Sequence, residues 1–571
     1  MNTTPKYDAQ EIQHIRAIFN LTQSAFAEAL GCSTKMVEEW ESGVSSPDDF
    51  ANKLIHMLQK RPEAFGIAVN LNETSIRDIP EFKRNLYYDT EETLRDGCAV
   101  FLLGSRKCGK SICMQQIRMS HENAEYYDVK QMTDAETDAL LDAISESISK
   151  NEDKIYLIDE ATYFENPEVS LAKISYSLND SPNTKTKFVF SGSQSVSLET
   201  WANLYFGGYM KMIHSDFISY PEWLAWKGIS EVSADTYHQF LLGTKEFYPR
   251  FETVEEYLNG CIEETLHSNQ KARNVIRDNS MEFVSTESLV SILYAALIAE
   301  SNRPSADSFF DTTQMFRDLR ANFKAIVKEI GTEEVQKRTE EFFAERVGRY
   351  TFLPFEELRQ NLIFLHRSNL LTITTVSDET ENFRNILNIH KDLRSMSPIL
   401  DNCMKIFRTA NISVKHPFFY AEIVKEVLKE AMPLNISGML LGGMVECHVR
   451  GLLPEDSCYE YHNNGREVDY VNFAQKKALE CTISNKHGSQ LRFDDLPDGF
   501  TCTLLTKDQD FTEKNGLVRI PYYQFIFQKS DGERTFALNN MTPQYTTGKE
   551  KKRSEEISPD KKSKQVGFED V

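Results

Sequence analysis

Short apolar runs alternate with helical patterns through the first half of the chain. The runs at 99–103, 155–158 and 187–190 each contain three to five consecutive apolar residues. Such runs are typical of strands that are buried on both faces of a parallel sheet, with helices as crossovers. The pattern predicts an α/β domain with a parallel sheet over residues 96–226.

The N-terminal segment has helical spacing instead. One apolar stripe contains Ile12, Ile15, Ile18 and Phe19. A second helix is expected to begin after the capping residue Thr22 and to stop at Gly31, and Ser33 is expected to cap a third. Two short helices joined through a glycine predict a helix-turn-helix bundle over residues 1–65.

The remaining chain divides by composition and periodicity. Residues 66–95 lack sustained periodicity and predict a connector, and 227–280 predict a helical lid. Residues 281–410 are mainly helical up to a β-rich run at 368–376. A helix followed by a short turn and such a run is typical of a winged helix that either binds DNA or packs against its neighbours. Residues 411–540 predict a second α/β domain, and the Lys/Glu/Ser-rich 541–571 predict a disordered tail.

Composition limits the class of protein. A chain of 571 residues is too long for one core, so three to five domains are expected. No apolar run approaches the roughly 18 residues that cross a bilayer, and the ten cysteines lack a C-x-x-C pair. These features predict a cytoplasmic protein that does not enter membranes. The net charge of −22 restricts any nucleic-acid contact to a local surface.

Candidate chemistry begins directly after the first apolar run. Residues 104–111 have the pattern G-x-x-x-x-G-K-[ST], in which backbone amides surround a phosphate. Gly104 and Gly109 permit the turn, Lys110 reaches the terminal phosphates, and the hydroxyl of Ser111 holds Mg²⁺. The segment predicts an ATP-binding loop with Mg²⁺ as its metal.

Two further strand ends complete this expectation. The second run ends in Asp159, predicted to share the metal with Ser111, and in Glu160, which is suited to polarising the attacking water. The third run ends near Ser193, where either a γ-phosphate sensor or a simple turn is expected. Together these motifs predict a nucleotide hydrolase core of the AAA+ type.

The N-terminal motif resembles the Cro/repressor (XRE-type) helix-turn-helix family, and especially its antitoxin-like members, over residues 21–47. The resemblance implies that Gln23, Thr34 and Lys35 face DNA in the major groove. However, residues 1–65 contain six lysines and arginines against nine aspartates and glutamates, a balance of −3. Binding of a protein or pairing of protomers is therefore the alternative to DNA binding.

Residues 95–530 resemble the DUF4143-associated bacterial and archaeal ATPases. After the third strand, that family has a Gly-Arg pair, and here Tyr209 occupies the place of the arginine. A charge-stabilising arginine therefore cannot be transferred from the family, although Lys211 or Arg250 could substitute. AAA+ relatives are often rings, so a homo-oligomer is a candidate assembly, but no hexamer is predicted.

The C-terminal part resembles the restriction-endonuclease-like fold of the PD-(D/E)xK type. The resemblance implies that Glu446, Asp469 and Glu480 form a carboxylate site that binds Mg²⁺ and activates water. Active members carry a lysine where this chain has Thr482, and Lys486 lies further along. A nuclease-like scaffold that binds without cleaving is therefore an alternative to a nuclease.

Three functions from different classes follow. The first is a bacterial AAA+ type ATPase that couples its nucleotide state to DNA-associated modules. The second is an ATP-dependent DNA nuclease. The third is a non-catalytic, NTP-responsive transcriptional or antitoxin-like regulator. The expected fold class is multidomain α/β: a helix-turn-helix bundle, a P-loop ATPase with a parallel sheet, a winged-helix region and a restriction-endonuclease-like domain.

Overall fold

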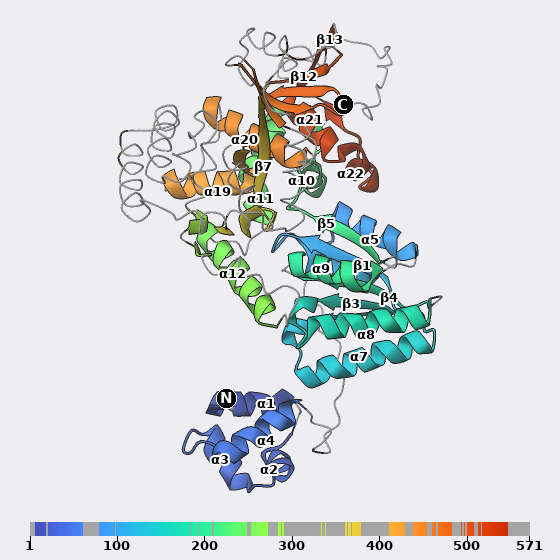
Figure 1. The fold of residues 1–571 in the computed structure, drawn as a ribbon, viewed down its shortest axis with the longest axis vertical. Helices are drawn as coiled ribbons and strands as arrows, with labels where there is room; N and C mark the ends of the chain where they lie inside the picture. The colour runs from blue at the N-terminus through green and yellow to red at the C-terminus, as the bar shows by residue number, and fades with distance from the viewer. Residues whose placement is uncertain are drawn as a thin grey trace. The chain divides into compact units, whose positions relative to one another are not determined.

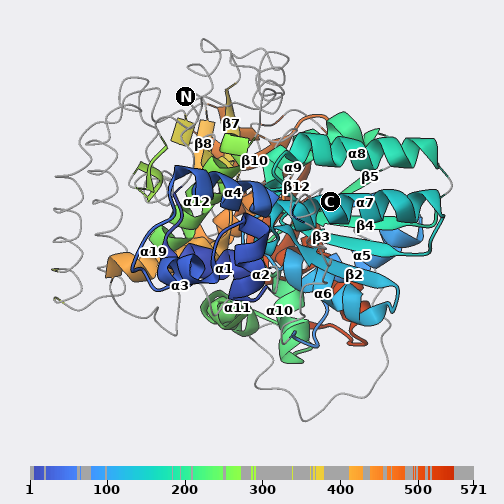
Figure 2. The same cartoon turned by 90° about the horizontal axis from the view of Figure 1, so that it is seen from below.

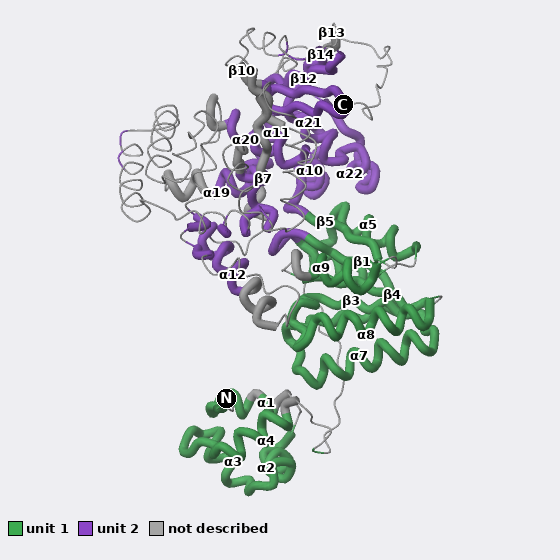
Figure 3. Tube along the Cα trace, viewed as in Figure 1, with its two compact units in different colours: residues 1–103, 109–215, 267–277 green, residues 104–108, 216–266, 278–571 purple. Residues whose placement is uncertain are grey.

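The structure is a computed structural model. It describes residues 6–18, 21–60, 65, 79–96, 99–182, 184–192, 195–207, 210–247, 253–271, 284–286, 288–290, 333, 337, 360–361, 364–366, 368–378, 410–428, 438–453, 459–463, 466–481, 493, 496, 499–507, 512–514 and 517–545. The chain divides into two compact units (Figure 3). Unit 1 contains 1–103, 109–215 and 267–277, and unit 2 contains 104–108, 216–266 and 278–571.

The N-terminal segment forms a small bundle of helices. These are α1 (Ala9–Ile18), α2 (Gln23–Leu30), α3 (Thr34–Glu41) and α4 (Asp49–Lys60). The side chains of Thr22 and Ser33 each accept a backbone amide at a helix start, and Gly31 adopts the left-handed conformation (φ 66°) that ends α2. The core of the bundle consists of Ile12, Ile15, Phe26, Ala27, Leu30, Val37, Trp40, Ile55 and Leu58.

A buried carboxylate ties three of these helices together. Glu41 on α3 lies 2.5 Å from the Nε of Arg16 on α1, and the Nε2 of Gln23 on α2 donates to it at 2.8 Å. Burial alone would raise the pKa of Glu41, but the hydrogen bonds from Arg16 and Gln23 outweigh it and leave the pKa lowered. Ionised Glu41 is therefore part of the bundle's stability.

The parallel sheet predicted for 96–226 is present in unit 1. Its strands are β1 (Ala99–Gly104), β2 (Ala124–Asp128), β3 (Ile155–Asp159), β4 (Lys187–Ser191) and β5 (Met210–Ser215). Their order is β2-β3-β4-β1-β5, and β1–β4, β3–β4 and β2–β3 pair in parallel. Asp128 is in register with Asp159, so the carboxyl ends of β2 and β3 bring two acidic residues to one edge.

Helices cover both faces of this sheet (Figures 1 and 2). They are α5 (Asn85–Arg95), α6 (Lys110–Ser120), α7 (Asp134–Ser149), α8 (Pro167–Asp180) and α9 (Ser195–Tyr205), with short 3₁₀ turns at Val129–Gln131 and Ala161–Tyr163. Alternate strand residues face opposite layers. Val100 and Leu102 pack with α5 and α6, while Phe101 and Leu103 pack with α7, α8 and α9. The strands are therefore apolar throughout because both of their faces are buried.

Helix α5 corrects the predicted connector, because the last third of 66–95 is helical. Leu86, Tyr87 and Leu94 of α5 are buried in the same layer as α6. Residues 85–95 therefore pack as part of the parallel-sheet domain.

Unit 2 contains a mixed sheet of eight strands in the order β13-β14-β12-β11-β10-β9-β7-β8. In that order they are Thr512–Lys514, Leu517–Pro521, Thr501–Thr506, Lys477–Cys481, Arg466–Asn472, Tyr459–Asn463, Leu371–Asp378 and Ala410–Val414. The helices are α10 (Tyr220–Lys227), α11 (Ala234–Phe247), α12 (Val254–Lys271), α19 (Pro417–Leu428), α20 (Gly438–Leu452), α21 (Tyr522–Lys529) and α22 (Gly532–Leu538). Strands β6 (Glu231–Val232) and β15 (Gln544–Tyr545) form a separate parallel pair.

Two predicted boundaries in this unit are wrong. The run assigned to a wing before residue 410 is β7, which pairs with β8 and in parallel with β9, so it is a strand of the C-terminal sheet. Residues 544–545, assigned to the predicted tail, form β15, which pairs with β6. Most of 281–410 and all of 546–571 lie outside the described residues. Among the described helices, none is long and apolar enough to cross a membrane.

Candidate nucleotide site and carboxylate cluster

The phosphate-loop motif lies between a buried strand and a helix. β1 ends at Gly104 and α6 begins at Lys110, so the loop residues precede a helix N-terminus, where backbone amides and the helix dipole favour an anion. Gly104, Lys107 and Gly109 have φ values of 133°, 60° and 95°. The two glycines adopt positive φ without strain, whereas the left-handed conformation of Lys107 persists only where its surroundings hold it. The side chain of Lys110 is buried at 6% exposure, and Ser111 is half-buried.

Asp159 is held at the end of β3 by three hydrogen-bond donors. The hydroxyl of Tyr126 donates to its Oδ2 at 2.8 Å, the backbone amide of Glu160 donates to its Oδ1 at 3.0 Å, and the hydroxyl of Ser191 also donates to Oδ1. Asp159 is 2% exposed. Burial and the charge of Asp159 raise the pKa of Tyr126, so the phenol stays protonated and remains a donor. The carboxylate therefore has a fixed orientation.

Glu160 has a backbone conformation that is uncommon for a residue with a side chain. Its φ and ψ are 51° and 43°, in the left-handed region, directly after the strand. This conformation costs on the order of 1 kcal/mol or more and is characteristic of functional positions. The backbone therefore turns away from the direction of β3 at the half-buried Glu160, immediately after Asp159.

Asp128 is an acidic neighbour that the sequence analysis missed. Burial and the nearby charge of Asp159 raise its pKa, while a hydrogen bond from Gln131 acts in the opposite direction. Asp128 could have been recognised in the sequence from its position at the end of a strand, as Asp159 was.

Arg84 is a second residue that the sequence analysis missed. A Cβ placed on Gly109 would lie 3.6 Å from the Nη1 of Arg84, so the guanidinium lies beside the phosphate loop. Arg84 also acts electrostatically on Cys113, one turn into α6. A cation at this position adds to the positive field that the loop offers to an anion.

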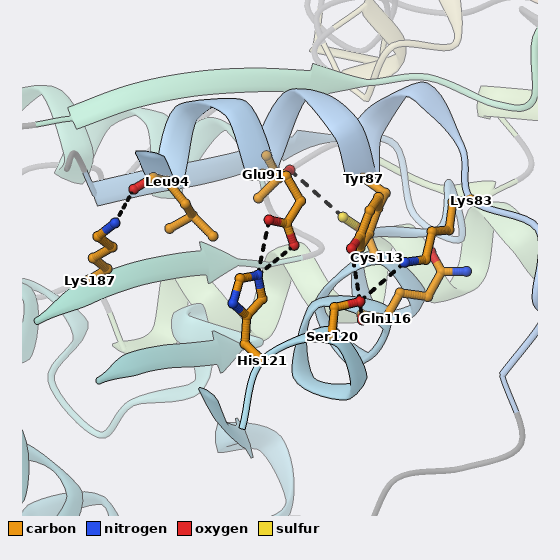
Figure 4. A network of polar contacts seen from close by, with 10 residues as sticks. Lys83, Tyr87, Glu91, Leu94, Cys113, Gln116, Ser120, His121 and Lys187 are labelled. Atoms are coloured by element: carbon orange, nitrogen blue, oxygen red, sulfur yellow. Dashed lines mark hydrogen bonds and ion pairs between the residues drawn. The ribbon is translucent and has the colours of Figure 1, made fainter. Parts of the chain in front are cut away.

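A network of polar contacts fixes the Arg84 segment on α6 (Figure 4). The amide of Gln116 donates to the carbonyls of Pro80 and Phe82, both at 2.9 Å. Lys83 and Tyr87 both donate to the hydroxyl of Ser120. Further along α5, Glu91 contacts the Nε2 of His121 at 2.8 Å, and the ammonium of Lys187 on β4 donates to the carbonyl of Leu94. These contacts hold α5 on the helix that follows the phosphate loop.

The predicted sensor, Ser193, lies outside the described residues, as does Tyr209. Ser191, two residues earlier on β4, is the serine that contacts Asp159.

The residues predicted to face DNA have different surroundings. Lys35 has an 82% exposed side chain, with its Nζ 3.8 Å from Glu39. Thr34 is half-buried at the start of α3. Gln23 donates to Glu41 within the bundle, so its amide already has an acceptor in the free protein. Of the three, Lys35 is the most accessible to a nucleic acid.

The C-terminal acidic residues are near one another without forming a metal cage. Burial raises the pKa of Asp469, and the charges of Glu480 and Glu446 raise it further. Glu446 accepts two hydrogen bonds from Arg450, at 2.6 and 2.9 Å, and Arg450 is only 4% exposed. Within the part of the chain that the structure describes, no three His, Cys, Asp or Glu side chains are placed to hold one metal ion. The three-carboxylate Mg²⁺ site stays a prediction, and Thr482 and Lys486 lie outside the described residues.

A phosphate loop between a parallel strand and a helix, with an aspartate at the end of a nearby strand, defines a P-loop nucleotide-binding domain. Residues 97–224 match the family model AAA_14, described as an AAA domain. The chain therefore carries an AAA domain of the P-loop ATPase class, which supports ATP binding.

Two solved structures are also similar to this chain. The Walker-type ATPase PABY2304 of Pyrococcus abyssi is 14% identical to this chain, with a TM-score of 0.30. The match covers 63% of this chain and 99% of the Pyrococcus chain. The Orc1 protein of Aeropyrum pernix, solved in complex with DNA, is 11% identical, covers 60% and 91%, and has a TM-score of 0.22.

The antitoxin HigA-2 of Vibrio cholerae is 40% identical over 53 residues. The match spans 9% of this chain and about half, 51%, of the antitoxin.

Proposed function

We propose that this protein binds and hydrolyses ATP with Mg²⁺ and couples its nucleotide state to DNA-associated modules. The observation that carries the proposal is the buried Asp159, held by three donors at the strand end, in the same domain as Lys110 at the start of α6. Asp159 lies at the carboxyl end of a parallel strand, the edge of an α/β sheet at which ligands bind, and its donors hold the carboxylate in one orientation, which suits a metal ligand.

The donor set fits Mg²⁺ and a triphosphate. Ser111 and Asp159 supply a hydroxyl and a carboxylate, which are hard oxygen ligands, and Mg²⁺ with a nucleotide uses few protein ligands because water and phosphates supply the rest. When bound, Mg²⁺ would neutralise charge on the phosphates. Lys110 would bind the terminal phosphates, and the amides of Gly104 and Gly109 would contribute to the cradle.

Glu160 would orient the attacking water, because its carboxylate follows Asp159 directly and its left-handed backbone directs it away from the strand. The hydroxyl of Ser191 would keep Asp159 in position, and Ser193 would contact the γ-phosphate. Under this assignment binding and turnover depend on different residues.

The experiment measures ATP binding and turnover on matched variants. Lys110→Ala is expected to abolish binding, whereas Glu160→Gln is expected to keep binding and to lower turnover by at least 100-fold, the scale of losing general-base assistance. Lys173→Ala removes an exposed lysine that pairs with Asp142 on another helix and is expected to change neither quantity. Equal loss of ATP binding in the Lys110 and Glu160 variants would overturn the separate roles.

The DNA-associated part of the proposal rests on the N-terminal bundle, with Lys35, Thr34 and Gln23 as the candidate contacts. Its test is ATP turnover with and without duplex DNA, where we expect stimulation. Turnover that ignores DNA would remove the coupling.

The match to antitoxin HigA-2 favours a second candidate, a regulator that binds one short DNA site and responds to nucleotide without turning it over. This candidate predicts tight, sequence-specific binding through residues 22–41 together with negligible hydrolysis, even when DNA is present. The turnover assay therefore separates the two.

For the C-terminal domain we propose a nuclease-like scaffold that does not cleave. The supporting observations are that Glu446 is paired with Arg450, whose Nη2 lies 2.6 Å from its Oε1, and that Thr482 stands where active members carry a lysine. We expect no Mg²⁺-dependent cleavage of DNA by the intact protein. Cleavage that disappears in Asp469→Ala would establish the nuclease instead.

A further inference from the structure

The phosphate loop is anchored by a helix that no sequence motif connects with it. Residues 104–108 group with unit 2, which also contains the first part of α12 (Val254–Lys271). The contacts between this loop segment and α12 therefore lie within one compact unit.

The first anchor is the side chain of Arg106 over Gly260 of α12. A Cβ added to Gly260 would lie 1.6 Å from the Nη1 of Arg106 and 2.4 Å from its Cζ. These distances are far below any real contact, so the guanidinium lies in the space that a side chain would fill. Glycine inside a helix is destabilising relative to alanine. Its presence at 260 is explained by the close approach of the Arg106 side chain, because any larger residue would collide with it.

The second anchor is the hydroxyl of Tyr257, one turn before Gly260. It donates to the backbone carbonyl of Arg106 at 3.1 Å, and Tyr257 is 1% exposed. Burial, with the nearby thiols of Cys261 and Cys108, raises the pKa of Tyr257, which keeps the phenol a donor at neutral pH.

A third contact fixes the preceding loop residue. The hydroxyl of Ser105 donates to the backbone carbonyl of Ser368 at 3.2 Å. The neighbouring Asn369 donates to Asp216 at 2.6 Å and accepts from the ammonium of Lys415. The turn at Ser368 and Asn369, which accepts the hydrogen bond from Ser105, is thus itself fixed by Asp216 and Lys415.

We propose that α12 pre-organises the phosphate loop through Arg106, which makes Gly260 and Tyr257 positioning residues for the nucleotide. The proposal rests on the proposed ATP site. Lys107, a residue with a side chain, has a φ of 60° in this loop, so the loop needs outside support to keep its conformation. A loop that is already held loses less freedom when the phosphates bind.

The experiment is a double-mutant cycle with Gly260→Ala and Arg106→Ala in the full chain, read out as the Kd for ATP with Mg²⁺. The new methyl group would displace only the end of a flexible side chain, so the protein is expected to fold. Gly260→Ala is expected to weaken ATP binding roughly 3- to 10-fold. This is the scale of the entropy lost when one long side chain, here the displaced Arg106, has to be ordered on binding. In the Arg106→Ala background the same change is expected to alter the Kd by less than about 2-fold, because the displaced group is gone.

Gly442→Ala is the matched control. Gly442 also lies inside a helix, α20, but its added Cβ would meet nothing within 4 Å. It is expected to leave the Kd unchanged, and Tyr257→Phe, which keeps the ring and removes the donor, is expected to weaken binding in the same direction as Gly260→Ala.

A second readout does not require ATP. Hydrogen exchange of the 104–111 amides in the nucleotide-free protein is expected to accelerate in Gly260→Ala and Tyr257→Phe and not in Gly442→Ala. If the wild type binds no ATP but exchange responds as described, the ATP site fails while the anchor stands. Unchanged exchange in Gly260→Ala, or an equal effect of this change with and without Arg106, would overturn the anchor.

Discussion

Replacing Tyr126 by phenylalanine tests how the buried carboxylate of Asp159 is prepared for a metal. The change removes one hydroxyl, which donates at 2.8 Å to Oδ2 of Asp159, and keeps the ring in a position that is 2% exposed. Ser191 and the amide of Glu160 continue to donate to Oδ1. The carboxylate therefore keeps its place but loses the contact that fixes its second oxygen.

The expected magnitude follows from the charge of the acceptor. A hydrogen bond to a charged group is worth about 1.5–3 kcal/mol, and loss of a group that orients a metal ligand typically costs 10- to 100-fold in metal affinity. Because two donors remain on Oδ1, we expect the lower end, an increase of about 10-fold in the Mg²⁺ concentration for half-maximal ATP turnover.

The neighbouring Tyr127→Phe is the matched control. Tyr127 is also buried, at 4% exposure, and also donates to a carboxylate, but its acceptor is Glu125 at 2.9 Å. Both variants are expected to lose about 1–2 kcal/mol of unfolding free energy, so stability alone does not distinguish them. The assay is a Mg²⁺ titration of turnover at saturating ATP. An equal Mg²⁺ dependence for the two variants would refute the reasoning.

Three further predictions address other parts of the molecule. Arg84→Ala is expected to weaken ATP binding about 10-fold, as for a lost charge-assisted contact, whereas the exposed Arg95→Ala at the other end of α5 is expected to leave the Kd unchanged; equal Kd values would contradict the role of Arg84. The folded-state pKa of Glu41 is lowered, so its contribution to stability is complete above the ordinary glutamate pKa of about 4.3 and disappears as the pH falls through the folded value. Hydrogen exchange of the bundle should therefore show less acid destabilisation for Glu41→Gln than for the wild type, and parallel pH profiles would argue against an ionised Glu41. Lys35→Ala is expected to weaken DNA binding uniformly across sequences and to reduce the slope of log K against log salt by about 1; an unchanged slope would exclude a phosphate contact.

The phosphate loop and the parallel sheet could be predicted because their chemistry is local. Surrounding a phosphate requires glycines and a lysine at fixed spacing within one short segment, and burial on both faces makes each strand apolar throughout. Asp159 followed for the same reason, as the polar residue that ends an apolar run.

Helix α5 was missed because two of its buried positions are polar. Thr90 and Thr93 donate their hydroxyls to the carbonyls of Leu86 and Asp89, four residues earlier, so both hydroxyls are satisfied within the helix although they are buried. An apolar pattern does not reveal such a helix, and Arg84 immediately before it carries no motif.

Long-range pairing explains the wrong boundaries. The β-rich run at 368–376 correctly indicates a strand, β7, but nothing local identifies its partners. Thr375 pairs with Ala410 on one side and with Tyr459 on the other. The contact between Arg106 and Gly260 could not be predicted from the sequence for the same reason, since Arg106 lies about 150 residues earlier.

Calorimetric titration of the full-length protein with ATP and Mg²⁺ tests the central claim most directly. The account predicts saturable binding at one site per chain, with no heat of binding in Lys110→Ala and unchanged heat in Lys173→Ala. A folded wild-type protein that gives no heat of binding with ATP, or a Lys110→Ala variant that binds as the wild type does, would contradict it.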